Sequence, residues 1–350
     1  MNQRRFRDLA LASVGIAILS LYLAWMLATR APAVENRLPV PVGGQVLHFG
    51  EAAQDAMHST GMTWVKWQIP FFEGVDLAVV RDRINRSREA GFLVLLSITG
   101  HKEDLANGGG DYVGAYADFL GEAAALGADA VEVWREMNID REWPTGQIDP
   151  AAYAHMLQKA FAAIKAANPD TLVITGALAP TNAEDAFGRR HVWNDDHYYA
   201  GMAKAGVADH ADCIGLRYTE GRLSPDSRAG DPRGEFPIWY LITMLKRVAW
   251  PFRNTEIPMC MTEIGYLSPE GYGPLPQGFA WASTTSVSEQ AAWLSQALLI
   301  MSNFEDMPVD LAIIWNIDFD TYGADPQAGY AIIRRDGSCP ACETIAQLQR

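Results

Sequence analysis

Short apolar runs alternate with longer helix-like stretches along most of the chain. Eight runs have the length and the apolar content of buried strands, at residues 45–49, 64–69, 93–99, 130–136, 172–177, 213–218, 259–263 and 311–316. The stretches predicted as helices lie at about 51–60, 76–90, 111–126, 150–167, 195–205, 236–249, 288–304 and 341–348. Strands that alternate with helices in this way indicate a parallel sheet covered by crossover helices.

The number of strand–helix pairs favours a closed barrel. Eight pairs within about 300 residues match the size and the repeat of a (β/α)8 barrel, the TIM-barrel architecture of the α/β class. An open, doubly wound sheet is the alternative, but it normally carries a glycine-rich phosphate turn after its first strand. No such turn follows residues 45–49. The sequence therefore predicts one (β/α)8 domain over residues 45–350.

A separate apolar segment precedes this domain. Residues 9–28, LALASVGIAILSLYLAWMLA, contain no charged side chain and, at ~1.5 Å per helical residue, match the thickness of a bilayer core. Arg4, Arg5 and Arg7 stand just before the segment, so the positive-inside rule places residues 1–8 in the cytoplasm as a basic tail. The sequence predicts a single-pass transmembrane signal anchor in the cell membrane, with the barrel on the extracytoplasmic side.

A cleaved signal peptide is the alternative to this anchor. Residues 31–33, Ala-Pro-Ala, resemble a processing site, and cleavage there would give a secreted protein. The apolar segment is longer than the ~7–15 residues typical of the apolar region within a signal peptide, which favours the anchor. Residues 29–44 are rich in proline and are expected to link the segment to the barrel.

Composition and charge narrow the possible partners. The chain is 49% hydrophobic and 20% charged, as is typical of a folded globular protein. Its formal net charge of −14 is opposite in sign to a nucleic-acid-binding surface, so no nucleic-acid partner is expected. Neither the cysteines nor the paired loop acids have the spacing of a zinc or calcium site. We therefore expect no metal and no cofactor.

The four cysteines suit an exported domain, in which disulfides are permitted. Cys339 and Cys342 form a CPAC motif after a Gly-containing turn, outside the strand–helix setting of a thioredoxin-like redox centre. The motif favours a local structural disulfide or two inert thiols over a thiol oxidoreductase. Cys213 and Cys260 each lie in an apolar run and are expected to be buried.

Two acidic residues end predicted strands, where a barrel places its active site. The fourth run, AVEVWRE, ends at Glu136, and the seventh, MCMTE, ends at Glu263. Two carboxylates that face one cleft suit glycoside hydrolysis, because one donates a proton to the leaving oxygen while the other attacks the anomeric carbon or activates water. The pair predicts a glycosidase site.

The residues around this pair resemble those of clan A glycoside hydrolases. WREMN (134–138) resembles the Trp-Asn-Glu-Pro motif on strand four of that clan, and MTEIGY (261–266) resembles its strand-seven nucleophile motif. WVKWQIPF (64–71) looks like strand two of the group near families 5 and 39, and the resemblance covers about residues 45–348. It implies a retaining enzyme in which Glu136 is the general acid/base and Glu263 the nucleophile.

The resemblance also suggests supporting residues. Tyr218, which ends strand six, would orient Glu263 and donate a hydrogen bond to it, and Trp315 would form the floor under the reactive sugar. Gln68 and His48 lie near strand ends and are candidates for contacts with sugar hydroxyls, although His48 is equally a candidate core histidine. Asn138 is either a substrate contact or a turn former.

The sequence departs from the family pattern beside the catalytic positions. Arg135 stands where the family normally has an Asn that binds the sugar 2-hydroxyl, Met137 replaces the usual Pro, and Arg217 stands where related sequences often have His. An Arg beside Glu136 favours the ionised carboxylate, which opposes its role as an acid. Two arginines near one cleft either bind an anionic sugar such as a uronic acid or indicate a decayed active site.

Two further features have structural interpretations. Glu132 lies on the same strand face as Glu136 but deeper in the barrel, and Lys66 lies in the second predicted strand. We interpret them as an interior ion pair rather than as catalytic groups. The long loop at 266–286 is rich in Gly, Pro and aromatic residues and is expected to form a wall of the cleft.

Together these features predict a membrane-anchored retaining glycosidase. It would hydrolyse O-glycosidic bonds of an extracytoplasmic polysaccharide by double displacement with two Glu residues. The alternative is a catalytically inactive barrel that binds glycan or acts as a scaffold in the cell envelope, an interpretation that rests on Arg135 and Arg217.

Overall fold

A computed structural model describes residues 38–349 of the chain. The predicted basic tail at 1–8, the transmembrane segment at 9–28 and most of the linker lie outside the described residues. Among the residues that are described, no helix combines the length and the apolar character needed to cross a membrane.

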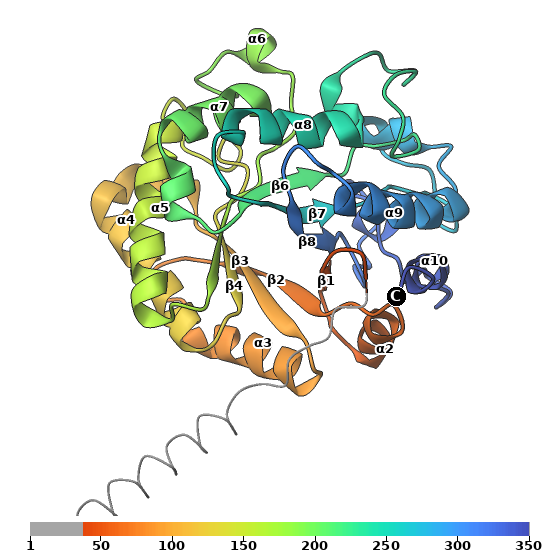
Figure 1. Cartoon of the computed structure of the whole chain (residues 1–350), viewed down its shortest axis with the longest axis horizontal. Coiled ribbons are helices and arrows are strands. Elements are labelled where there is room, and N and C mark those ends of the chain that lie inside the picture. The colour runs from red at the N-terminus through yellow and green to blue at the C-terminus, as the bar shows by residue number, and fades with distance from the viewer. Residues whose placement is uncertain (1–37, 350) are drawn as a thin grey trace, which may run out of the picture. The chain divides into compact units, whose positions relative to one another are not determined.

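Eight parallel strands form the centre of the domain, with helices around them (Figure 1). They are β1 (Val42–Gln45), β2 (Trp64–Pro70), β3 (Leu93–Thr99), β4 (Ala130–Val133), β5 (Leu172–Thr175), β6 (Ile214–Tyr218), β7 (Met259–Ile264) and β8 (Val309–Ile314). Their order is β5-β4-β3-β2-β1-β8-β7-β6, and one parallel bridge between Ile174 and Cys213 joins the two outer strands. The predicted α/β TIM barrel is confirmed, and the open-sheet alternative is wrong.

Helices follow the strands in the predicted order. They are α2 (Glu51–Ser59), α3 (Leu77–Glu89), α4 (Lys102–Ala125), α5 (Pro150–Ala167), α6 (Glu184–Phe187), α7 (Asp195–Lys204), α8 (Leu241–Phe252), α9 (Val287–Ser302) and α10 (Pro340–Ala346). Capping residues fix where two of these helices begin. At α5 the Asp149 side chain accepts a hydrogen bond from the Ala151 amide, and Pro150 is the first helical residue. At α9 Ser286 and Glu289 form a capping box. The local sequence therefore sets these boundaries.

Several elements differ from the prediction at their ends, among them β1 and α4. β1 begins and ends earlier than the predicted run because Gly43 and Gly44 hide its apolar pattern. A Cβ at Gly43 would lie 2.5 Å from the Trp64 Cβ and 2.7 Å from Ile313, so only glycine fits beside these side chains. α4 begins nine residues before the predicted start and includes a break at Gly109, which has a φ of 49°.

The barrel interior has an apolar layer below a polar one. The apolar layer consists of a small buried cluster: Trp64, Leu95, Ala130, Ile174, Cys213, Cys260, Leu311 and Ile313. In the next layer, two residues further along each strand, Lys66 follows Trp64 on β2 and Glu132 follows Ala130 on β4. Both side chains are charged and buried. The polar layer lies on the side of the barrel that carries the carboxyl ends of the strands, so it forms the base of the candidate site.

Both cysteine pairs are disulfides. Cys339 and Cys342 are bonded to each other at the start of α10. Of the two predicted alternatives, a local disulfide and two free thiols, the disulfide is confirmed. Cys213 and Cys260 are buried, as predicted, but they are also bonded to each other across 47 residues of sequence. This second bridge connects the starts of β6 and β7 within the apolar layer.

Candidate active site

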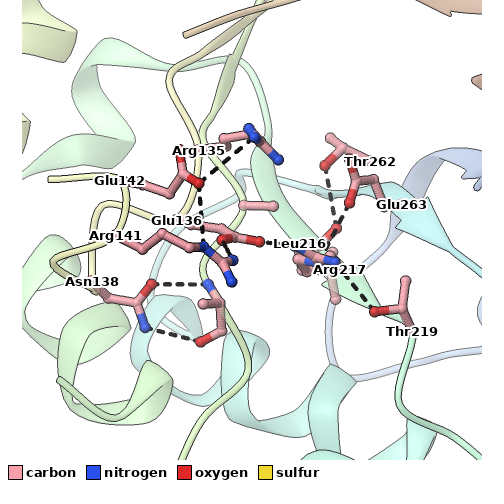
Figure 2. A network of polar contacts seen from close by, with 12 residues as sticks. Arg135, Glu136, Asn138, Arg141, Glu142, Leu216, Arg217, Thr219, Thr262 and Glu263 are labelled. Atoms are coloured by element: carbon pink, nitrogen blue, oxygen red, sulfur yellow. Dashed lines mark hydrogen bonds and ion pairs between the residues drawn. The ribbon is translucent and has the colours of Figure 1, made fainter. Parts of the chain in front are cut away.

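An unusual backbone segment after β4 presents Glu136. The strand ends at Val133, and Trp134 and Glu136 then adopt φ values of 65° and 48°, a region that side chains other than glycine rarely occupy. The Glu136 amide donates to the Ala177 carbonyl at 2.7 Å, which ties the segment to the chain after β5. Trp134 is fully buried in the large apolar core, whereas Glu136 points toward Arg217 (Figure 2). Glu136 and Arg217 lie at the end of the barrel that carries the carboxyl ends of the strands, which we call the mouth.

Glu263 reaches the same mouth from β7. One carboxylate oxygen lies 3.3 Å from Lys66 Nζ and 3.4 Å from Gln68 Nε2, and the other lies 3.4 Å from Arg217 Nε. Only 4% of Glu263 is exposed. The predicted acid of β7 is thus held between groups from β2 and β6.

Arg217 connects the two candidate catalytic residues. Its Nη1 forms an ion pair with Glu136 Oε1, while its Nε faces Glu263 Oε2 (Figure 2). The second oxygen of Glu136 forms an ion pair with Arg141. Since one guanidinium touches both carboxylates, Glu136 and Glu263 lie on either side of Arg217. The space between the two carboxylates, which this side chain occupies, is called the gap below.

A buried lysine supports the site from below. Lys66 Nζ lies 2.9 Å from Glu132 Oε2, and each side chain is 1% exposed, which confirms the predicted interior ion pair. Lys66 also donates to the Thr262 carbonyl at 3.0 Å, and the Thr262 hydroxyl donates to Glu132 at 2.7 Å. The interior pair therefore extends to Glu263, and Lys66 fixes the position of that carboxylate.

Nearby cations favour the ionised form of both acids. Burial alone would raise the pKa of Glu263, but Lys66, Arg217 and Arg135 more than offset it and hold the pKa at about 2. Glu263 is therefore a carboxylate at neutral pH, which suits a nucleophile. Glu136 has a guanidinium on each oxygen, so its charged form is stabilised until at least one arginine moves away.

Opposite charges are paired in the mouth. Four carboxylates, on Glu132, Glu136, Glu142 and Glu263, meet four cations, on Lys66, Arg135, Arg141 and Arg217. The sequence prediction missed Arg141 and Glu142, whose side chains lie 3.4 Å apart. The sequence did offer one indication of them, because both lie in the loop after β4, at the end of the barrel where active sites form.

The predicted role of Tyr218 is wrong. Its hydroxyl donates to the Trp239 carbonyl at 2.7 Å, and its ring packs edge-on against Tyr266, so it does not orient Glu263. Successive strand residues face opposite sides, and Arg217 is the residue of β6 that faces Glu263. Arg217 thus takes the place expected for Tyr218.

Asn138 holds the loop rather than a substrate. Its Nδ2 donates to the carbonyls of Ala179 and Trp193, at 2.9 and 3.0 Å, and its Oδ1 accepts from the Ala179 amide at 2.8 Å. The side chain is fully buried. The structure therefore agrees with the turn-forming alternative and corrects the prediction of a substrate contact.

The other predicted residues lie at different distances from the gap. Gln68 contacts Glu263, and Arg135 lies beside the gap, with its Nη2 3.7 Å from Glu142. Trp315 directly follows β8, is half-buried and packs edge-on against Tyr330, with ring centroids 4.6 Å apart. Its role under a sugar remains a prediction.

His48 is neither a core histidine nor a neighbour of the carboxylate pair. Its exposed ring lies 3.3 Å from Asp320, on the rim of a surface hollow of about 640 Å³ that Tyr272 and Tyr322 also line. The predicted wall at 266–286 supplies Trp281 to the apolar cluster that contains Trp315, so this loop packs beside the end of β8.

Comparison with known proteins identifies the fold. No model of a known protein family matches the chain, and no curated protein matches it. The fold is similar to a glucosidase from Croceicoccus marinus, with 13% identity, a TM-score of 0.59, and 91% of this chain and 68% of that chain covered. It is also similar to a GH39 β-xylosidase from Caulobacter crescentus, with 16% identity, a TM-score of 0.56, and coverage of 91% and 73%.

A third solved structure has the same architecture. An endo-1,4-β-mannanase from Rhizomucor miehei shares 10% identity at a TM-score of 0.54, with 88% of this chain and 94% of that chain covered. At such low identity these likenesses establish the barrel fold and leave the activity to be argued from the site.

Proposed function

We propose that this chain is a glycoside hydrolase that cleaves O-glycosidic bonds of a polysaccharide by double displacement. The observation that supports this most strongly is the contact of one guanidinium, that of Arg217, with both Glu136 and Glu263. Two carboxylates around one side chain at the carboxyl end of a barrel are the pair of groups that glycoside hydrolysis requires. The solved structures with this fold that are named as glycosidases agree with the proposal.

The two carboxylates would divide the chemistry between them. Ionised Glu263 attacks the anomeric carbon, and the bond to the leaving oxygen breaks as that oxygen takes a proton from Glu136. In the second step Glu136 accepts a proton from water, the water oxygen bonds to the anomeric carbon, and Glu263 leaves as a carboxylate. Configuration is retained because the anomeric carbon is displaced twice.

Glu136 requires a rearrangement before it can donate a proton. Arg141 is 69% exposed and can turn into solvent, which removes a cation from the buried Glu136 and favours its protonated form, whereas Arg217 is 18% exposed and is held within the mouth. We infer that binding of the sugar separates Glu136 from these guanidiniums. Once separated, Glu136 takes up a proton from water and can then donate it to the leaving oxygen.

We also propose that the barrel acts outside the cytoplasm. Support comes from the uncharged run at residues 9–28 and from two disulfides within the barrel, which persist in oxidising compartments. The substrate would then be a polysaccharide of the cell envelope or its surroundings.

A second candidate function has one observation in its favour. Both oxygens of Glu136 are occupied by guanidiniums, which is the arrangement expected of a carboxylate that no longer serves as an acid. On this alternative the barrel binds glycan without cleaving it.

One hydrolysis experiment separates the two candidates. The purified full chain is incubated with β-glucan, β-mannan, β-xylan and β-galactan oligosaccharides and their C6-oxidised counterparts where these exist, and new reducing ends are measured. The proposal expects release by the wild type, loss of release in Glu136→Gln and Glu263→Gln, and normal release in a control at exposed Glu73, Glu73→Gln. Binding without release by the wild type would contradict it and favour the inactive barrel.

A further inference from the structure

We propose that the site selects a sugar that carries a carboxylate, a uronic acid residue, and that Arg217 is its specificity-determining residue. The inference rests on the proposed function, because it takes the gap between Glu136 and Glu263 as the seat of the sugar. It adds the chemical class of the substrate, which the fold does not supply.

Arg217 occupies the gap that a sugar must enter. Its guanidinium contacts Glu136 through Nη1 and Glu263 through Nε, and its Nη2 lies 3.3 Å from the Thr219 hydroxyl (Figure 2). The side chain comes from β6 and is 18% exposed, so it has little freedom to leave the mouth. An incoming sugar must therefore separate this guanidinium from at least one carboxylate.

The cost of that separation depends on the charge of the sugar. A neutral sugar would leave a largely buried guanidinium short of a charged partner, which is strongly unfavourable. A sugar carboxylate would replace the lost partner and can pair with a guanidinium through two parallel hydrogen bonds. The arrangement of Arg217 thus favours an anionic sugar over a neutral one of the same shape.

A second arginine is available on the other side of the gap. Arg135 is 32% exposed, and its nearest acid is Glu142, at 3.7 Å, a distance longer than a hydrogen bond. Figure 2 shows its head group pointing from the β4 side toward Thr262 and Glu263. Arg135 is therefore weakly engaged and can contribute a second guanidinium to a bound carboxylate.

The test compares sugars that differ only in the carboxylate. β-1,4-Glucan, β-mannan and β-galactan oligosaccharides are each paired with the uronate made by oxidising C6, so linkage and length are unchanged within a pair. Binding to the full chain is measured by titration calorimetry with Glu136→Gln, which slows hydrolysis, and with wild type. We expect at least one uronate to bind about tenfold or more tightly than its neutral counterpart, with an advantage that falls as salt is added.

Variants assign the preference to Arg217. Arg217→Gln should abolish the difference within the preferred pair, while Arg253→Gln, at an exposed arginine at the end of α8, should preserve it. Circular dichroism of Arg217→Gln verifies that the barrel is folded, and the wild-type comparison stands without this variant. Equal binding within every pair, no binding of any uronate, or a preference that survives in folded Arg217→Gln would overturn the inference.

This readout is independent of hydrolysis. A barrel that prefers uronates but releases no product would contradict the proposed function and leave the substrate class standing. Release of product from neutral oligosaccharides alone would support the proposed function and contradict the preference for uronates.

Discussion

Arg217 lies directly opposite Glu263 in the β6–β7 pairing, and its Nε is 3.4 Å from the Glu263 carboxylate. The pairing results from an irregularity in the ladder: Leu216 is opposite Met261, but the next residue of β6 is opposite Glu263, so Thr262 is the extra residue of β7. This bulge places a guanidinium against the proposed nucleophile and connects it to Glu136.

The low pKa of Glu263 predicts how stability depends on pH. A carboxyl whose pKa is about 2 in the folded chain, against an ordinary value of 4.5, stabilises the fold above 4.5 and loses this contribution as the pH falls toward 2. Glu263→Gln should therefore lose the part of the pH dependence that lies between these two values. Urea unfolding of both proteins across this range measures it, and parallel curves would contradict the assignment.

Lys66 is expected to be the most sensitive charged residue of the barrel interior. Lys66→Met leaves Glu132 and Glu263 buried without this cation and should lower the free energy of unfolding by about 3–5 kcal/mol. The exposed control Lys246→Met should change it by less than about 0.5 kcal/mol. Urea denaturation gives both values, and adding Glu132→Gln to Lys66→Met should recover part of the loss. Similar stability of Lys66→Met and the control would reject the role of Lys66.

Gly176 is expected to matter for activity through the segment that presents Glu136. A Cβ at this position would lie 2.7 Å from the Trp134 carbonyl oxygen and 2.9 Å from that of Val133, so the backbone before Glu136 must shift. Gly176→Ala should reduce kcat/KM about tenfold or more and cost about 1–3 kcal/mol of stability.

Gly114 provides the matched control for this substitution. It lies within α4, and a Cβ there would meet no heavy atom within 4 Å. Gly114→Ala should keep full activity and raise stability by about 0.5–1 kcal/mol, because alanine favours the helix. If Gly176→Ala were as active as Gly114→Ala, the geometry of the segment would not control Glu136.

The two disulfides should differ in their contribution to stability. Cys213 and Cys260 close a loop of 47 residues, which the chain-entropy model values at about 4 kcal/mol, whereas Cys339 and Cys342 are 3 residues apart and give about 2 kcal/mol. Urea unfolding of Cys213→Ala/Cys260→Ala and Cys339→Ala/Cys342→Ala measures both losses. An equal or smaller loss for the interior pair would contradict this ranking.

The order of elements could be predicted from the sequence because each strand and helix carries its own periodicity. The predicted ranges at 93–99 and 150–167 coincide with β3 and α5, where an apolar run and an Asp-Pro cap define the ends locally. The predicted range for β1 lies too late in the sequence because Gly43 and Gly44 have no apolar side chain. Glu136 and Glu263 were predicted as site residues because they follow apolar runs of strands that a barrel brings together, and their catalytic roles await the experiments proposed here.

Other features depend on contacts that no local pattern reveals. Which of Arg217 and Tyr218 faces Glu263 depends on a bulge between β6 and β7, and the pairing of Cys213 with Cys260 depends on which strands are neighbours. Arg141 reaches Glu136 through an irregular loop, whose course a periodicity argument does not describe. The contacts of these residues could therefore be found only in the folded structure.

In the proposed mechanism Glu263 forms a covalent bond with the sugar while Glu136 supplies the proton. The most direct measurement incubates the full chain with an activated 2-fluoro glycoside of the sugar found to be cleaved, digests the protein and locates the added mass by tandem mass spectrometry. We expect one sugar on Glu263 in wild type and in Glu136→Gln, and none in Glu263→Gln. A sugar attached to any other residue, or hydrolysis with inverted configuration and no adduct, would contradict it.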